Sequence, residues 1–184
     1  MSNRLFLDIS STCTGYVITS ADKDVTILEY GAIWFHKDDK TADKCYKLYS
    51  FVSGVDDKYS NMEQVVFESY SFNLKNPNGS LVCPQLQGAV MAAAKEAEWN
   101  IEDITPQTWR KQCGIKPVKT EKKKRDYKIP TEAYFRGRYN IPGKIISNVT
   151  GNLRTTPNDV FDALGVCEGY YRLTGLTEFK MGEK

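Results

Sequence analysis

The sequence has one histidine, no Cys-x-x-Cys pair and no long apolar run. Zinc sites are built from sets of histidine and cysteine ligands, so their scarcity argues against a zinc protein. A bilayer-spanning helix needs roughly 18 or more apolar residues, and the N-terminus lacks the basic-then-apolar pattern of a secretory signal. We therefore expect a cytoplasmic protein that does not associate with a membrane.

The cysteines also lack the pattern of a disulfide framework. They are five in number, and an odd number cannot all pair within one chain. Disulfides are rare in the cytosol, where thiols are kept reduced. We therefore expect five free thiols at Cys13, Cys45, Cys83, Cys113 and Cys167.

Neither sign of charge dominates, because the formal net charge is only +2. Any surface that attracts nucleic acid must therefore come from local clustering. The stretch KPVKTEKKKRDYK at residues 116–128 holds seven lysines and arginines against two acids. Such a cluster is typical of a phosphate-binding surface, although charged loops without a ligand are also common. We expect a DNA-contacting segment at residues 116–154, with the contacts made by Lys119, Lys122, Lys123, Lys124 and Arg125.

Hydrophobic periodicity predicts a single α/β domain over residues 1–175, with a mixed five-stranded sheet flanked by helices. Strands are expected at residues 4–9, 15–19, 26–35, 64–68 and 101–104, and helices at 44–52, 81–99, 105–109 and from 156 onward. Thr105-Pro106 is a helix start, because threonine caps the first turn and proline suits its first position. Residues 176–184 are expected to form a frayed tail.

Four acids stand at the ends of these predicted elements. Asp8 closes the apolar run RLFLD, Glu68 closes QVVFE, and Asp159 and Asp162 lie three residues apart at the start of the last helix. Taken singly, each has an ordinary structural explanation as a turn residue, a solvated edge residue or a favourable charge in a first helical turn. Taken together at a buried sheet edge, they would repel one another unless cations neutralised them.

Carboxylate ligands select hard cations, so Mg²⁺ is expected, with Mn²⁺ as the alternative. Two such ions roughly 3.5–4 Å apart activate a water molecule and stabilise the leaving oxygen of a phosphodiester. The acids therefore indicate a metal-dependent nuclease with two ions per active site.

Three stretches resemble the RuvC-type Holliday-junction resolvases of the ribonuclease H-like superfamily. They are Asp8 with the turn from Ser10 to Tyr16, Glu68 after Val-Val-Phe, and the closing NDVFDALGVCEGY. The middle stretch ITPQTWRKQCGIK is also similar to theirs. The resemblance implies a ribonuclease H-like fold and a homodimer that nicks two strands of a four-way junction. It also implies that Asp8, Glu68, Asp159 and Asp162 are the metal ligands, with Asp8 bridging the ions.

The loop after Glu68 holds further candidates for DNA binding. Related resolvases place an aromatic residue here that stacks on bases at the crossover, and aromatic stacking on an unpaired base is worth about 1–3 kcal/mol. Phe72 is the first candidate and Tyr70 the second, although either residue would also suit a core. Lys75 is the cationic candidate of the same loop.

Two departures from the family pattern stand out. The turn Ile9–Cys13 lacks the family's proline and glycine, and residues 134–154 resemble an insertion relative to bacterial members. Such departures fit phage-encoded members, for which the cytoplasm would be that of the host.

Alternatives remain open at this point. The same acids and basic segment suit a broader nuclease for flaps and forks, or a junction-binding module without catalysis. The actin-like ATPases share the strand-end aspartate but need two such domains, which argues against them in a chain of 184 residues. The small-residue stripe of residues 81–97 suits either a dimer interface or a core helix.

Overall fold

The computed structural model describes residues 2–21, 24–70, 77–119 and 125–182. In chain order its elements are β1 (Ser2–Ile9), β2 (Cys13–Ala21), β3 (Val25–Trp34), α1 (Thr41–Lys58), β4 (Met62–Glu68), α2 (Pro77–Glu96), β5 (Asn100–Ile104), α3 (Pro106–Gln112), β6 (Val118–Lys119), β7 (Arg125–Asp126), α4 (Lys128–Tyr139), β8 (Lys144–Ile146), β9 (Leu153–Thr155), α5 (Asn158–Leu173) and β10 (Phe179–Met181). The predicted strands and helices are confirmed, including the start of α3, where the Thr105 side chain accepts a hydrogen bond from the backbone N–H of Thr108. None of the helices within these ranges combines the length and apolar character that crossing a bilayer requires.

The predicted mixed sheet is confirmed, and β1 lies in its interior. The strand order is β10-β3-β2-β1-β4-β5. Strand β1 pairs antiparallel with β2 and parallel with β4, while β5 continues the parallel half. The antiparallel meander β1–β2–β3 and the parallel strands β1, β4 and β5 therefore share one central strand.

The sheet has six strands rather than the expected five, because the C-terminal segment forms β10. Its three residues pair parallel with β3, from Phe179 opposite Val25 to Met181 opposite Ile27. The Phe179 ring also packs 6.2 Å from the Tyr171 ring. The prediction that residues 176–184 fray was therefore wrong over β10, because edge pairing and one aromatic contact order so short a strand.

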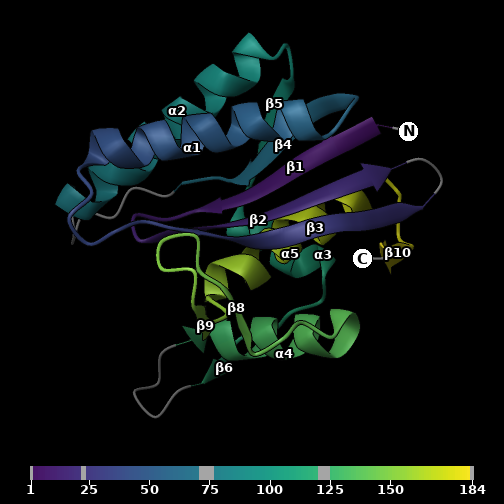
Figure 1. Ribbon diagram of the computed structural model, residues 1–184. Helices are drawn as coiled ribbons and strands as arrows, with labels where there is room; N and C mark the ends of the chain where they lie inside the picture. Colours follow the sequence, from purple (N-terminus) through teal and green to yellow (C-terminus); the bar gives the residue numbers. More distant parts are fainter. Residues whose placement is uncertain (1, 22–23, 71–76, 120–124, 183–184) are drawn as a thin grey trace.

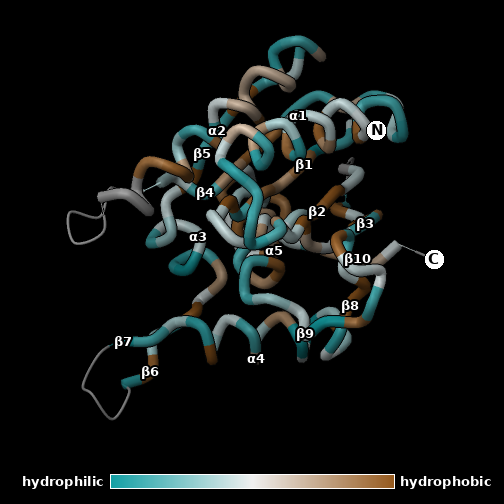
Figure 2. Tube along the Cα trace, turned by 60° about the vertical axis from the view of Figure 1, so that its left-hand side comes forward, coloured by the Kyte–Doolittle hydropathy of each residue, from teal (hydrophilic) through white to brown (hydrophobic). Residues whose placement is uncertain are grey.

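The helices cover both faces of the sheet. Figure 1 shows α1 and α2 on one face, α3 and α5 on the other, and α4 with the short hairpins beyond α5, an arrangement that Figure 2 shows from a second side. Side chains alternate along β1, so Leu5 and Leu7 pack under α1 and α2 whereas Phe6 packs under α5. Asp8, two residues after Phe6, consequently faces the α3 and α5 side.

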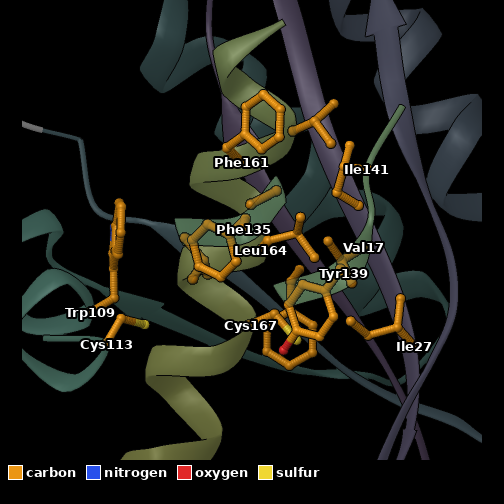
Figure 3. Packing of buried hydrophobic residues seen from close by; sticks show 14 of the residues in the cluster. Val17, Ile27, Trp109, Cys113, Phe135, Tyr139, Ile141, Phe161, Leu164 and Cys167 are labelled. Carbon is orange, nitrogen blue, oxygen red and sulfur yellow. The ribbon is translucent and has the colours of Figure 1, made fainter. Parts of the chain in front are cut away.

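Helix α5 forms the centre of one core. Ten of its residues are buried, and Figure 3 shows Phe161, Leu164 and Cys167 among side chains from the sheet and from α4. Larger side chains would not fit at these buried positions, because packing at interior density leaves no room for extra methylene groups. The position of α5 on the sheet is therefore tightly determined.

Helix α4 is attached to α5 by a buried carboxylate. Glu168 is 1% exposed and accepts 2.9 Å hydrogen bonds from the hydroxyls of Tyr134 and Tyr139. It also pairs with Arg172 at 2.5 Å and with Arg138 at 3.3 Å. Hydrogen bonds and opposite charges together offset the desolvation of the buried charge.

All five cysteines are free, as predicted. Cys45 on α1 is partly exposed, and the other four are buried.

Candidate active site

Asp8 and Glu68 lie side by side at the ends of two adjacent parallel strands. The register pairs Leu7 of β1 with Phe67 of β4, so the next step along each strand reaches the two acids. Both acids face the α5 side, because they follow Phe6 and Val66 by two residues and these two residues pack in the core under α5. Together they line a cavity of about 230 Å³.

The N-terminus of α5 reaches the same edge of the sheet through one glycine. Gly15 of β2 is paired with Asp8 of β1. A β-carbon at Gly15 would lie only 1.9 Å from the carbonyl oxygen of Asp159, so a side chain there would displace the helix. Gly15 therefore allows α5 to place Asp159, and Asp162 one turn later, beside the strand that carries Asp8.

Burial and mutual repulsion disfavour the charged forms of these acids. The pKa of Asp8 is raised well above its ordinary value by burial and by the charges of Glu68, Asp162 and Asp159. Burial and the Glu68 charge raise the pKa of Asp162 to about 7. Burial also raises the pKa of Glu68 and of Asp159. The predicted acids therefore share one electrostatic neighbourhood.

The donor chemistry fits a hard divalent cation, although the side chains do not adopt a coordination geometry. Within the described ranges, no three histidine, cysteine, aspartate or glutamate side chains converge closely enough to hold a metal ion. Four partly buried carboxylates that repel one another would nevertheless be stabilised by a bound cation, and oxygen-only donors favour Mg²⁺ or Mn²⁺. The structure thus brings the four acids to one edge of the sheet without bringing their side chains together as a ligand set.

Trp109 of α3 is a contact of the site that sequence reasoning missed. Its indole Nε1–H donates a 2.7 Å hydrogen bond to Oε2 of Glu68. The ring is fully buried against α5, where β-carbons at Gly165 and Gly169 would lie 2.5 and 2.4 Å from Trp109. Two glycines one turn apart on the last helix were the available signal, since such a pair leaves a flat surface for a large ring.

Arg110, the next residue on α3, is a cation whose charge acts on three of the four acids. It lowers the pKa of Asp8, Glu68 and Asp162 against the stronger effect of burial. Its guanidinium carbon lies 4.6 Å from the Trp109 ring centre and 4.7 Å from that of Tyr127. The buried Nε of Arg110 has no hydrogen-bond partner in the part of the chain that the structure describes. This cation therefore contacts two aromatic rings, acts electrostatically on the acids and keeps an unused donor.

The DNA-binding candidates are described only in part. Tyr70 is half-buried and lines the cavity of Asp8 and Glu68. Lys119 and Arg125 are exposed and pair across the β6–β7 hairpin. Phe72, Lys75, Lys122, Lys123 and Lys124 lie outside the described residues.

Three solved structures share the fold of this chain over nearly its whole length. RuvC from Thermus thermophilus in complex with a Holliday junction substrate matches with 16% identity and a TM-score of 0.64, over 97% of this chain and 99% of that one. A second structure of Thermus thermophilus RuvC matches with 15% identity and a TM-score of 0.66, over 96% of this chain and 98% of that one. The yeast mitochondrial Holliday junction resolvase Ydc2 gives 14% identity and a TM-score of 0.60, over 95% and 79%. No curated protein sequence matches the chain.

A sequence model of one family matches the chain directly. The family is described as crossover junction endodeoxyribonuclease RuvC, and the match covers residues 5–125. This range includes Asp8, Glu68 and Trp109, while Asp159 and Asp162 follow it within the shared fold. The chain belongs to the RuvC family of crossover junction endodeoxyribonucleases.

Proposed function

We propose that this chain resolves four-way DNA junctions by paired nicks and that Asp8, Glu68, Asp159 and Asp162 hold two Mg²⁺ ions, or Mn²⁺ ions, for the reaction. The observation that carries the assignment of these residues is the contact of α5 with Gly15, which brings the α5 acids beside Asp8 and Glu68. Cations bound there would supply an activated water and would stabilise the leaving oxygen of the phosphodiester.

The chain's own residues prepare the site for this chemistry. Asp8 is held by its pairing with Gly15 of β2, one residue beyond the point where the pairing of β1 with β4 ends at Leu7. Trp109 orients Glu68 through the indole hydrogen bond, and Arg110 provides a nearby positive charge for an approaching phosphate. Rigid strands and a second layer of oriented groups keep the ligands within the narrow range of geometry that catalysis needs.

The proposed partner is branched DNA, above all the four-way junction, and its contacts extend beyond the acids. Tyr70 and Phe72 are proposed to meet unpaired bases near the crossover, with Lys75 beside them. Lys119 and Arg125, together with Lys122, Lys123 and Lys124 between them in sequence, are proposed to neutralise phosphates. Support comes from the exposure of Lys119 and Arg125 on the β6–β7 hairpin and from the position of Tyr70 at the acid-lined cavity.

We also propose that the active form is a homodimer that pairs through the outward face of α2. The inward stripe of this helix, including Leu86 and Val90, is buried in the core. The outward face carries Leu81 at 58% and Met91 at 43% exposure, with open space at Gly88. Two active sites related by a two-fold axis would match the symmetry of a junction.

The test uses a labelled four-way junction, a flap and a linear duplex, each with Mg²⁺, with Mn²⁺ and with chelator. Asp8→Asn, Glu68→Gln and Asp162→Asn are compared with Asp57→Asn, which alters an exposed carboxylate on α1. We expect the wild type and the control variant to nick the junction in pairs when metal is present. The three site variants should bind the junction without cutting it.

Other outcomes would change the assignment. Cutting of the flap as readily as the junction would indicate a broader branched-DNA nuclease. Junction binding without cutting by the wild type in either metal would indicate a non-catalytic binding module. Unfolding of all three site variants would mark the acids as structural.

A further inference from the structure

A second cavity includes one of the four acids, Asp159, in its wall. It has a volume of about 780 Å³ and is formed by the β1–β2 turn, the end of β3 with the residues that follow it, the start of α1, the β8–β9 turn and the segment that leads from β9 into α5. Asp159 is part of its wall, as are Lys37, Lys44 and Arg154. Figure 1 shows the segment before α5 beside the turn at the end of β1 and β2. We refer to this space as the Arg154 cavity.

Cations outnumber acids on the wall of the Arg154 cavity, since three of its side chains are lysine or arginine and only Asp159 is acidic. Lys44 is held in place: its ammonium donates a 2.7 Å hydrogen bond to the Ser11 carbonyl and lies 5.5 Å from the Phe35 ring centre. Lys37 is exposed at the rim. A concave surface with this charge attracts an anion.

Arg154 is supported by a fixed aromatic surface. Its guanidinium carbon lies 5.4 Å from the ring centre of Trp34, which is only 5% exposed. The backbone of Trp34 is in turn held by Asn148, whose Oδ1 accepts from the Trp34 N–H at 2.7 Å and whose amide donates to the Trp34 carbonyl at 3.2 Å. A guanidinium placed on a rigid ring loses less side-chain entropy on binding, and its fork of donors suits a phosphate.

The acids of the site divide between two cavities. Asp8 and Glu68 line the smaller one, and Asp159 lines the Arg154 cavity. The Cys13 thiol in the wall of the Arg154 cavity lies within the electrostatic reach of both groups, since burial, Asp159 and Asp8 raise its pKa whereas Arg154 lowers it. A nucleic acid strand whose phosphodiester reaches the acids must extend in both directions from the cleaved bond.

We propose that the Arg154 cavity binds the backbone of the cleaved strand at a nucleotide next to the scissile phosphate, with Arg154 as the main phosphate ligand and Lys37 as a second. This inference rests on the proposed function, because it takes the acids as the place of cleavage. The DNA-contacting segment expected at residues 116–154 ends at Arg154, but the contacts assigned within it lie in the basic cluster at residues 116–128 and do not include Arg154.

The test replaces single charged phosphates of the junction by neutral methylphosphonates at each position flanking the cleaved bond. Affinity is measured in chelator, so that no strand is cut, for the wild type, Arg154→Gln, Arg154→Lys and Lys144→Gln. Lys144 is the matched control, because it lies on the same β8–β9 hairpin but lines a different groove along β3. Thermal melting of each variant verifies the fold.

One neutral position is expected to weaken wild-type binding roughly tenfold, as for the loss of a hydrogen bond to a charged group. Arg154→Gln should bind the unmodified junction as weakly as the wild type binds the junction with that methylphosphonate. Neutralising the same phosphate should then weaken the binding of Arg154→Gln no further. Lys144→Gln should behave as the wild type. Arg154→Lys should restore part of the sensitivity. This loss of additivity identifies a direct contact.

The inference would be overturned if the affinity losses from Arg154→Gln and from the methylphosphonate were additive at every position. It would also be overturned if Arg154→Gln bound the unmodified junction with full affinity. The proposed function is judged separately by metal-dependent cutting in the wild type. A protein that cuts junctions but shows additive losses would lose only the Arg154 contact, whereas a protein that neither binds nor cuts junctions would lose both proposals.

Discussion

The Trp109 indole and the Glu68 carboxylate form a 2.7 Å hydrogen bond that joins α3 to the end of β4. Trp109→Phe would remove the donor and keep most of the buried ring. Groups that orient metal ligands typically contribute about 10–100-fold in metal affinity or activity. We expect such a loss in cleavage rate, with part of it recovered at high Mg²⁺ concentration, measured as rate against metal concentration.

Trp99→Phe is the control for this prediction. Trp99 is also buried, at 2% exposure, and its indole donates a 3.0 Å hydrogen bond to Asp56, which is not one of the site acids. Both variants should lose similar stability. Equal activity of the two variants would contradict the positioning role of Trp109.

Gly15→Ala tests the contact between β2 and α5. The new methyl group would meet the Asp159 carbonyl oxygen at 1.9 Å, and overpacking against backbone costs about 3 kcal/mol or shifts the helix. We expect a lower melting temperature and loss of cleavage. Gly54→Ala on α1 is the control, because open space surrounds Gly54 and alanine favours a helix by about 0.5–1 kcal/mol. An active, stable Gly15→Ala protein would argue against the close approach of α5.

The buried acids predict an unusual pH dependence of stability when metal is removed. Burial and the Glu68 charge raise the pKa of Asp162 from 3.8 to about 7 in the folded state. A raised folded-state pKa contributes stability at low pH that is lost as the pH rises through the folded value. In chelator, the free energy of unfolding should therefore fall between about pH 4 and pH 7, and Asp162→Asn should reduce this fall.

Added Mg²⁺ should restore stability at neutral pH, because a ligand that binds only the folded state stabilises it. Denaturant unfolding at several pH values, with and without the ion, measures both effects. A stability that rises with pH in chelator would contradict the electrostatic account of the site.

Glu168→Ala tests the attachment of α4. It would leave Arg138, Arg172 and two tyrosine hydroxyls without their shared acceptor, and breaking a buried ion pair typically costs about 3–5 kcal/mol. Glu132→Ala is the control on α4, where the glutamate is 40% exposed and pairs with Arg136 on the surface. Such a surface pair contributes about 0.3–0.5 kcal/mol. Similar melting temperatures for the two variants would refute the anchoring role of Glu168.

The β6–β7 hairpin makes a prediction about salt. If Lys119 and Arg125 contact phosphates, the glutamine variant of each should lower the slope of log affinity against log salt by about 0.9. Lys180→Gln on β10 is the control, because Lys180 pairs with Asp24 at the β10 edge of the six-stranded sheet, whereas β6 and β7 form a separate two-stranded sheet. An unchanged slope in both hairpin variants would remove this hairpin from the DNA interface.

The sequence allowed Asp8 and Glu68 to be placed together, because two apolar runs that end in acids predict adjacent strand ends. It could not predict how α5 reaches them, since that depends on the absence of a side chain at Gly15 and on the pairing of Gly15 with Asp8. Trp109 was assigned only to a helix, because its partner Glu68 is 41 residues away.

Two other features could not be predicted from sequence patterns. Strand β10 has three residues, too few for an alternating pattern, and its order comes from pairing with β3. The cavity around Arg154 joins five separate segments, so neither its shape nor the support of Arg154 by Trp34 follows from local periodicity.

The burial of four of the five thiols has a practical consequence for single-molecule work. Burial raises the pKa of all five thiols, so the difference between them lies in access: Cys45, on the side of the sheet away from α5, is the partly exposed thiol. A maleimide dye must reach the sulfur to react, so brief labelling should attach one fluorophore, at Cys45. The native chain therefore already has a single labelling site, Cys45, for measuring its binding to DNA by energy transfer.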